Sequence, residues 1–229
     1  MLETTTNEGR IISAAMALAA ERSWSAMTLS EIAERASVTL VDLKGHFGSK
    51  GDILSAFARL VDDEVLRRTP PRAAAMAPRD ALFDVVMGRF DVLEPYKNAL
   101  KSIASDAMMD PFRVPPFLTT QRWMLEAAGI SAHGVDGGLR VAGLAAVYAS
   151  VFRTWLEDDD AGLSRTMAAL DRRLRRGEQA LHRVAEVRGV VVRVVDTIAG
   201  MFAKRTARPP SEAAAASPPP TAPPSGAPI

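Results

Sequence analysis

The chain has no cysteine among its 229 residues, which excludes a disulfide framework, cysteine ligands for zinc or an iron–sulfur cluster, and a thiol nucleophile. Histidine is scarce as well, because only three are present and they lie far apart in the sequence. The motifs G-x-S-x-G and H-E-x-x-H and the phosphate-binding P-loop are missing. We therefore expect no cofactor and a protein that is not an enzyme.

An excess of charge is also lacking, since 28 Lys and Arg stand against 27 Asp and Glu. This balance does not by itself indicate a nucleic-acid partner. Residues 1–9 are polar and acidic, which predicts no signal peptide. No run of about 18 residues is apolar and free of charge, proline and glycine, so we expect no membrane span. These features favour a cytoplasmic protein.

Helical periodicity dominates what is present. Over residues 8–205 apolar residues recur at intervals of three and four, which predicts an all-α fold of about ten helices. The Val-rich stretch 187–195 is the one ambiguity. The Gly-rich stretch 134–143 has no phosphate-binding lysine and is interpreted as a loop. Further breaks are predicted at Pro70, Pro71, Pro78, Pro95, Pro111, Pro115, Pro116, Gly129 and Gly177.

These breaks and the composition divide the chain into four parts. Residues 1–68 form an N-terminal head, 69–78 a linker, 79–206 a larger C-terminal helical bundle, and 207–229 a tail. Eight of the 15 prolines lie in the tail, which predicts disorder with polyproline II character. A role as a PxxP ligand is the alternative for that segment.

Four short helices are predicted in the head, over 8–22, 28–36, 40–46 and from 49 to about 68. Three of them begin with the capping-box pattern, in which a hydroxyl residue is followed three positions later by an acidic one. The second and third helices, joined by a tight turn, make a helix-turn-helix of the kind that enters the DNA major groove. Short capped helices also occur in ordinary bundles. The three box pairs are Thr28 with Glu31, Thr39 with Asp42, and Ser49 with Asp52.

A continuous stretch of about 45 residues here resembles the DNA-binding domain of the TetR family of bacterial repressors. The resemblance implies a TetR-like fold in which the head reads DNA and the C-terminal bundle dimerises and holds an effector. It rests on Arg10-Ile11-Ile12, Ala14-Ala15, Thr28-Leu29-x-Glu31-Ile32-Ala33, Ala36-Ser37-Val38-Thr39 and His46-Phe47-x-Ser49-Lys50-x-Asp52-Ile53-Leu54.

The third helix departs from the family pattern, because Val41, Asp42 and Lys44 replace a small residue, a threonine and a tyrosine. The family tyrosine touches a phosphate, and Lys44 would replace it as a point charge, whereas Asp42 would be repelled. The head is not basic, with eight Lys and Arg against ten Asp and Glu. The residues expected to face double-stranded DNA are Thr28, Thr39, Leu40, Lys44, His46 and Lys50.

Aromatic and methionine side chains gather in the bundle, where they form either core or the lining of an apolar ligand cavity. The candidate lining residues are Phe83, Met87, Phe90, Ile103, Phe117, Trp123, Met124, Val147 and Tyr148. The acidic run 157–160 is read as a cap for a helix starting near residue 161 rather than as a metal site.

Residues 178–205 form an amphipathic pattern, and 165–205 carry ten Lys and Arg against four Asp and Glu. This segment is either a last bundle or dimer helix or a helix that lies on an anionic membrane surface. Residues 93–99 and 153–158 resemble ubiquinone-biosynthesis lipid-binding proteins, which have a TetR-like fold, hold an isoprenoid-type ligand and use a C-terminal amphipathic helix at membranes.

Two functional hypotheses remain. The leading one is a homodimeric TetR-like repressor that an apolar small-molecule effector releases from its operator. The alternative is a lipid-binding accessory protein of ubiquinone biosynthesis that kept the fold and lost DNA binding.

Overall fold

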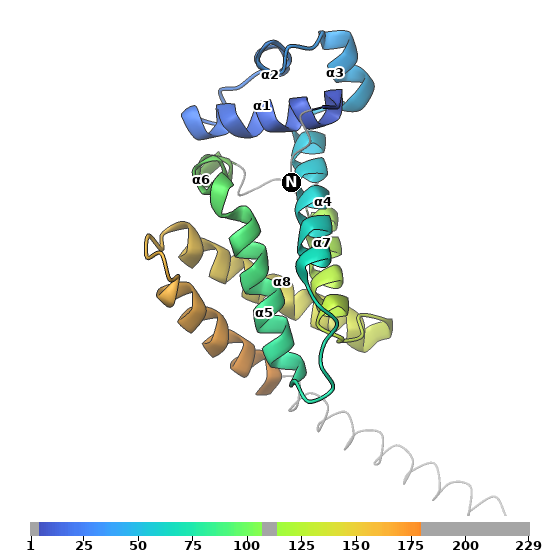
Figure 1. Ribbon diagram of the computed structural model, residues 1–229, viewed down its shortest axis with the longest axis vertical. Helices are drawn as coiled ribbons and strands as arrows, with labels where there is room; N and C mark the ends of the chain where they lie inside the picture. The colour runs from blue at the N-terminus through green and yellow to red at the C-terminus, as the bar shows by residue number, and fades with distance from the viewer. Residues whose placement is uncertain (1–4, 107–113, 180–229) are drawn as a thin grey trace, which may run out of the picture. The chain divides into compact units, whose positions relative to one another are not determined.

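Helices make up every regular element in the part of the chain that the computed structural model describes, which is residues 5–106 and 114–179. The all-α fold class is confirmed (Figure 1). A last helix starts at residue 164 and reaches the end of the described range. Before it, in order, come α1 (Asn7–Glu21), α2 (Leu29–Arg35), α3 (Leu40–His46), α4 (Lys50–Arg68), α5 (Pro78–Leu93), the 3-10 helix η1 (Glu94–Tyr96), α6 (Lys97–Asp106), α7 (Val114–Ala127) and α8 (Gly134–Leu156).

Reciprocal capping starts α2 and α3. The Thr28 hydroxyl accepts from the Glu31 N–H at 3.3 Å, and the Thr28 N–H donates to the Glu31 carboxylate at 2.8 Å. Thr39 and Asp42 form the same box, at 3.0 and 3.1 Å. Both boxes were predicted, and both are confirmed.

The third predicted box, before α4, is only half formed. Ser49 accepts from the Asp52 N–H at 3.2 Å, but the Asp52 carboxylate accepts from the Gly48 N–H at 3.0 Å instead of the Ser49 N–H. The return bond therefore reaches one residue further back and closes the turn that joins α3 to α4.

A Schellman turn separates α2 from α3. The Val38 N–H donates to the Ala33 carbonyl and the Ser37 N–H to the Glu34 carbonyl, both at 3.0 Å. Ser37 adopts φ of 53°, the left-handed conformation that this turn requires at the residue after the cap. The turn reverses the chain within a few residues, and α3 then begins at Leu40.

One core joins the head to the bundle. Ile11, Ile12 and Ile53 are fully buried from the head side, and Val86 and Phe90 from α5. The Phe90 ring stacks on Tyr148 and Trp155 of α8, with centroids 5.5 and 5.3 Å apart. In Figure 1, α4 runs from the group formed by α1, α2 and α3 into the rest of the described part.

A polar contact between the residues that follow α1 and helix α6 supplements this core. Asp106 accepts from the Ser25 N–H at 2.7 Å and from the Ser23 hydroxyl at 2.6 Å. Ser102 accepts from the Trp24 N–H at 3.0 Å and donates to the Arg22 carbonyl at 2.9 Å. The end of α1 is therefore fixed to α6 by four hydrogen bonds.

The prediction of a loop over 134–143 is wrong, because α8 begins at Gly134. Glycine served there as a loop signal, but Gly137 is buried and packs against the backbone of Ala132. A Cβ atom at Gly137 would come within 3.0 Å of three Ala132 backbone atoms. The glycine thus allows a close backbone approach inside a helix.

The predicted break at Gly177 is also wrong, since the helix that starts at 164 continues through it. Asp160 accepts from the N–H groups of Gly162 and Ser164, each at 3.2 Å, so it caps a helix that begins three residues later than predicted. Breaks do occur at Pro95, which lies in η1, and at Gly129, which has φ of 68° just after α7.

The amphipathic pattern 178–205, apart from residues 178 and 179, and the tail 207–229 lie outside the described residues. By length and hydropathy, α8 is the one helix among the described residues that could cross a membrane. A core helix meets the same criterion, and Leu144, Val151 and Trp155 of α8 are buried in the core.

Candidate nucleic-acid interface and ligand cavity

Helix α3 is anchored to the fold by one side chain, Leu43, which is buried. Its other residues are exposed, including Leu40 at 51% and Val41 at 80%. Large apolar side chains that are this exposed do not contribute to the core of the single chain, and they can mark an interaction surface. The helix thus presents a surface that the rest of the fold does not use.

Two of the predicted DNA-facing side chains, Thr28 and Thr39, hold the ends of α2 and α3. Their hydroxyls accept a backbone N–H and donate to Glu31 and Asp42, at 2.8 and 2.7 Å. The backbone N–H and hydroxyl of Thr28 lower the pKa of Glu31 to about 2. The hydroxyl and backbone N–H of Thr39 likewise lower the pKa of Asp42. Both carboxylates are therefore charged at neutral pH.

The predicted basic contacts divide into two kinds. Lys44 and His46 are exposed on α3. Lys50 is half-buried, and its ammonium donates to the carbonyls of Trp24 and Met27, both at 2.7 Å, and of Ser25 at 3.4 Å. These bonds use its three donors. Burial lowers the pKa of Lys50.

A cavity of about 460 Å³, hereafter the larger cavity, opens between α4, α6, α7 and α8, with Arg89 and Leu93 of α5 in its wall. Its surface is mainly apolar. The residues that line it are Gly51, Leu54, Ser55, Ala58, Arg89, Leu93, Leu100, Ile103, Ala104, Pro116, Phe117, Thr120, Tyr148, Ala149, Phe152, Arg153 and Leu156.

Three of the nine predicted lining residues, Ile103, Phe117 and Tyr148, border this cavity. Phe90 lies behind its wall, stacked on Tyr148. Trp123 is 49% exposed on α7 and Met124 is buried. The remaining three, Phe83, Met87 and Val147, are half-buried against the core and do not border the cavity.

A buried polar network forms part of the cavity wall. The Arg89 guanidinium pairs with Asp62 of α4 and donates to the Tyr148 hydroxyl at 3.1 Å. The second Asp62 oxygen accepts from the Thr120 hydroxyl at 2.9 Å. Burial acts to lower the pKa of Arg89, but Tyr148 and Asp62 outweigh it and raise this pKa. Burial raises the pKa of Tyr148, so its phenol is neutral at physiological pH.

This network was not predicted from the sequence, although the sequence contains a signal for it. Arg89 lies four residues after Val85 and four before Leu93, so it shares the buried face of α5 with them. A charged residue at such a position needs a buried partner. The partner, Asp62, is 27 residues away on α4, and no sequence pattern identifies it.

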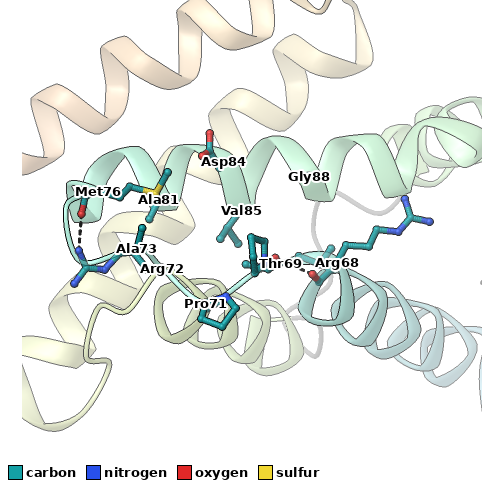
Figure 2. Close-up of a pocket in the computed structure, with 13 residues that line it drawn as sticks. Arg68, Thr69, Pro71, Arg72, Ala73, Met76, Ala81, Asp84, Val85 and Gly88 are labelled. Atoms are coloured by element: carbon teal, nitrogen blue, oxygen red, sulfur yellow. Dashed lines mark hydrogen bonds between the residues drawn. The ribbon is translucent and has the colours of Figure 1, made fainter.

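A second cavity, of about 250 Å³, lies where the segment after α4 passes α5 (Figure 2). Thr69, Pro71, Ala73 and Met76 face Ala81 and Val85 of α5, together with the other lining residues. The Arg72 guanidinium donates to the Met76 carbonyl at 2.5 Å and closes this segment on itself. The volume of this second cavity is about half that of the larger cavity.

The acidic run 157–160 is structural. Asp158 is buried and accepts from the Thr166 N–H and hydroxyl, at 2.8 and 2.7 Å, and its backbone carbonyl accepts from the Lys97 ammonium at 2.6 Å. Among the described residues no group of three or more His, Asp or Glu side chains is arranged to hold a metal ion.

Known proteins resemble this chain in its head and in its fold. Residues 11–57 match the family model described as "Bacterial regulatory proteins, tetR family". A search of curated proteins finds no match.

Solved structures share the fold. The TetR transcriptional regulator from Nitrosomonas europaea ATCC 19718 is 22% identical with a TM-score of 0.58, covering 75% of this chain and 98% of its own. A TetR transcriptional regulator from Rhodococcus sp. RHA1 is 21% identical with a TM-score of 0.56, covering 76% of this chain and 94% of its own. The head of this chain, from α1 to α4, is thus similar to the tetR family of bacterial regulatory proteins, and the chain has the fold of these solved TetR regulators.

Proposed function

We propose that the protein is a cytoplasmic, non-enzymatic transcriptional repressor that inserts α3 into the major groove of operator DNA. The observation that carries this proposal is the exposure of α3. Leu43 is its one buried residue, and the Thr39–Asp42 capping box holds its start. An α-helix fits the width of the major groove, and a recognition helix must offer side chains that its own fold does not need.

Each exposed side chain of α3 has a distinct task in this proposal. Leu40 and Val41 contact thymine methyl groups, which are the apolar features of the groove. Lys44 and His46 face phosphates or base edges. Thr28 and Thr39 place the helix by capping, since their hydroxyls are already paired. Lys50 stabilises the head and does not contact DNA, because its ammonium already donates to the carbonyls of Trp24 and Met27.

The repressor acts as a homodimer that reads two half-sites of a near-palindrome. The helices over 139–156 and 162–176 form the interface in this proposal. Apolar side chains exposed in or beside these segments support it: Val135 and Leu139 on α8 and Met167 on the last helix. An isologous interface of more than about 1,000 Å² is expected for a stable dimer.

Release from DNA follows when an apolar effector occupies the larger cavity. Leu54 and Ser55 of α4 and Leu100 and Ile103 of α6 line that cavity. Helix α4 starts four residues after α3 ends, and α6 is bonded to the end of α1 through Ser102 and Asp106. An effector that favours one placement of these helices would select one spacing of the two heads.

Selection of bound genomic DNA fragments by the purified protein tests the proposal, followed by titration of the selected fragment at several salt concentrations. Lys44→Ala should weaken binding to all sequences and reduce the slope of log K against log salt by about 0.9, the value of one phosphate contact. Lys101→Ala, which removes an exposed cation of α6 beside Asp159, should leave the slope unchanged.

Enrichment of no DNA would refute the repressor and favour a lipid-binding accessory protein, which needs the cavity but not α3. A selected fragment bound equally well by Lys44→Ala, with an unchanged slope, would refute only the placement of Lys44.

A further inference from the structure

We infer that the larger cavity takes an amphipathic anion, with an apolar body inside the cavity and one carboxylate paired with Arg153 at its edge. This inference rests on the proposed effector role of the cavity and adds the chemical class of the effector.

The charges that line the cavity are of one sign. Its described lining holds two arginines and no aspartate or glutamate. Arg89 is already neutralised, because it pairs with Asp62, and both oxygens of Asp62 are occupied by Arg89 and Thr120. Arg89 therefore contributes hydrogen-bonding capacity to the wall but no net charge.

Arg153 is different, because it is exposed and has neither a hydrogen bond nor an ion pair with any described residue. It extends from α8 one residue after Phe152, which also lines the cavity. A free guanidinium next to apolar surface binds a carboxylate with two parallel N–H···O bonds. Arg153 is thus the one unneutralised charge along the described lining.

The rest of the lining selects an apolar body. Besides Tyr148, seven large side chains without polar atoms face the cavity: Leu54, Leu93, Leu100, Ile103, Phe117, Phe152 and Leu156. A volume of about 460 Å³ lies in the range of small-molecule sites, in which apolar surface supplies affinity and a few polar groups fix orientation. An alkyl or aryl chain fills such a space.

The same inventory disfavours the other charge classes. An ammonium group would find no free carboxylate in the described lining and would meet Arg153 at the edge. A neutral molecule would gain the apolar contacts without using Arg153. Among molecules with one chain length, the order of affinity should therefore be carboxylate, then alcohol, then amine.

Isothermal titration calorimetry of the full-length protein with decanoate, decan-1-ol and decylamine at pH 7.4, below their aggregation limits, tests this order. Decanoate should bind at least tenfold more tightly than decan-1-ol, and decylamine most weakly. In Arg153→Gln the advantage of decanoate over decan-1-ol should fall to about threefold or less, with decan-1-ol unchanged. Arg153→Lys should keep most of it.

Two further variants place the site. Arg122→Gln removes another exposed arginine, on α7 outside the cavity, and should keep the wild-type order. Ala149→Trp should fill the cavity and weaken decanoate and decan-1-ol alike. Unfolding midpoints of the ligand-free variants show that each is folded.

Equal binding of the three probes, tighter binding of decylamine, absence of decanoate binding, or a wild-type order in Arg153→Gln would each overturn the inference. Undiminished binding in a folded Ala149→Trp would overturn the cavity as its site. None of these results bears on the repressor proposal, because fragment selection is done without probes. Failure of that selection would in turn leave the order of probe affinities unchanged.

Discussion

Arg89 and Asp62 form an ion pair that is almost entirely buried, with 6% and 11% of their side chains exposed. Arg89→Met should lower the free energy of unfolding by about 3–5 kcal/mol, because it leaves a buried carboxylate without its counter-charge. Asp62→Leu should cost a similar amount for the opposite reason. Urea unfolding followed by circular dichroism measures both.

The double variant Asp62→Leu/Arg89→Met separates pairing from packing. It should be less destabilised than Arg89→Met alone, because no unpaired charge remains in the interior. Additive losses in the double variant would show that the two side chains stabilise the fold independently, contrary to the geometry.

Lys50 and Lys44 should have opposite effects on stability and on DNA binding, because Lys50 is hydrogen-bonded inside the head whereas Lys44 is exposed. Lys50→Met should lower the free energy of unfolding by about 1–3 kcal/mol, because three carbonyls lose a charged donor. Lys44→Met should leave stability nearly unchanged. For DNA binding the salt slope should change in Lys44→Met and not in folded Lys50→Met, a pattern that thermal unfolding and salt titration check together.

At the scale of the element, the start of α8 depends on Gly137. Gly137→Ala should destabilise the protein by about 3 kcal/mol or more, because the added Cβ would meet backbone atoms of Ala132 that cannot rotate away. Gly88→Ala in α5 is the matched control, with no atom within 4 Å of its new Cβ. It should gain about 0.5–1 kcal/mol from helix propensity. Thermal unfolding measures both variants. Midpoints that shift in the same direction in Gly137→Ala and Gly88→Ala would contradict this account.

Local chemistry explains which elements were predictable. The bounds of α3 and the boxes of α2 and α3 follow from residues three positions apart, so the sequence contains all of the information. The start of α8 at Gly134 could not be predicted in this way, because it depends on the packing of Gly137 against the backbone of Ala132. The return bond of Asp52 went to Gly48 for a similar reason, since the sharp turn after α3 brings that N–H within reach.

At the scale of the molecule, α8 presents apolar residues to solvent near its start. Leu139→Asp should convert a dimer into a monomer, because a symmetric interface would bring two new negative charges close together. Met76→Asp, at an exposed apolar residue of the segment after α4, should remain a dimer. Sedimentation equilibrium at micromolar concentration distinguishes the two. A wild-type protein that sediments with the mass of one chain would refute the dimer.

The cavity was predictable in kind but not in detail. Aromatic and methionine side chains in the bundle pointed to an apolar site, and Ile103, Phe117 and Tyr148 do line one. Periodicity shows which face of a helix is buried but not whether that face meets another helix or an empty space, so Met124 and Phe90 lie in the core. Leu54 and Ser55 escaped attention because they belong to the head in sequence.

Helix α4 belongs to two sites at once, because it starts just beyond α3 and four of its residues line the larger cavity. In the proposed repressor this makes the two binding equilibria linked. By thermodynamic reciprocity, an occupant that lowers operator affinity tenfold is itself held ten times less tightly by the operator-bound protein. Operator DNA would then act as an antagonist of the small molecule, and the concentration needed for release would rise with the affinity of the protein for its operator.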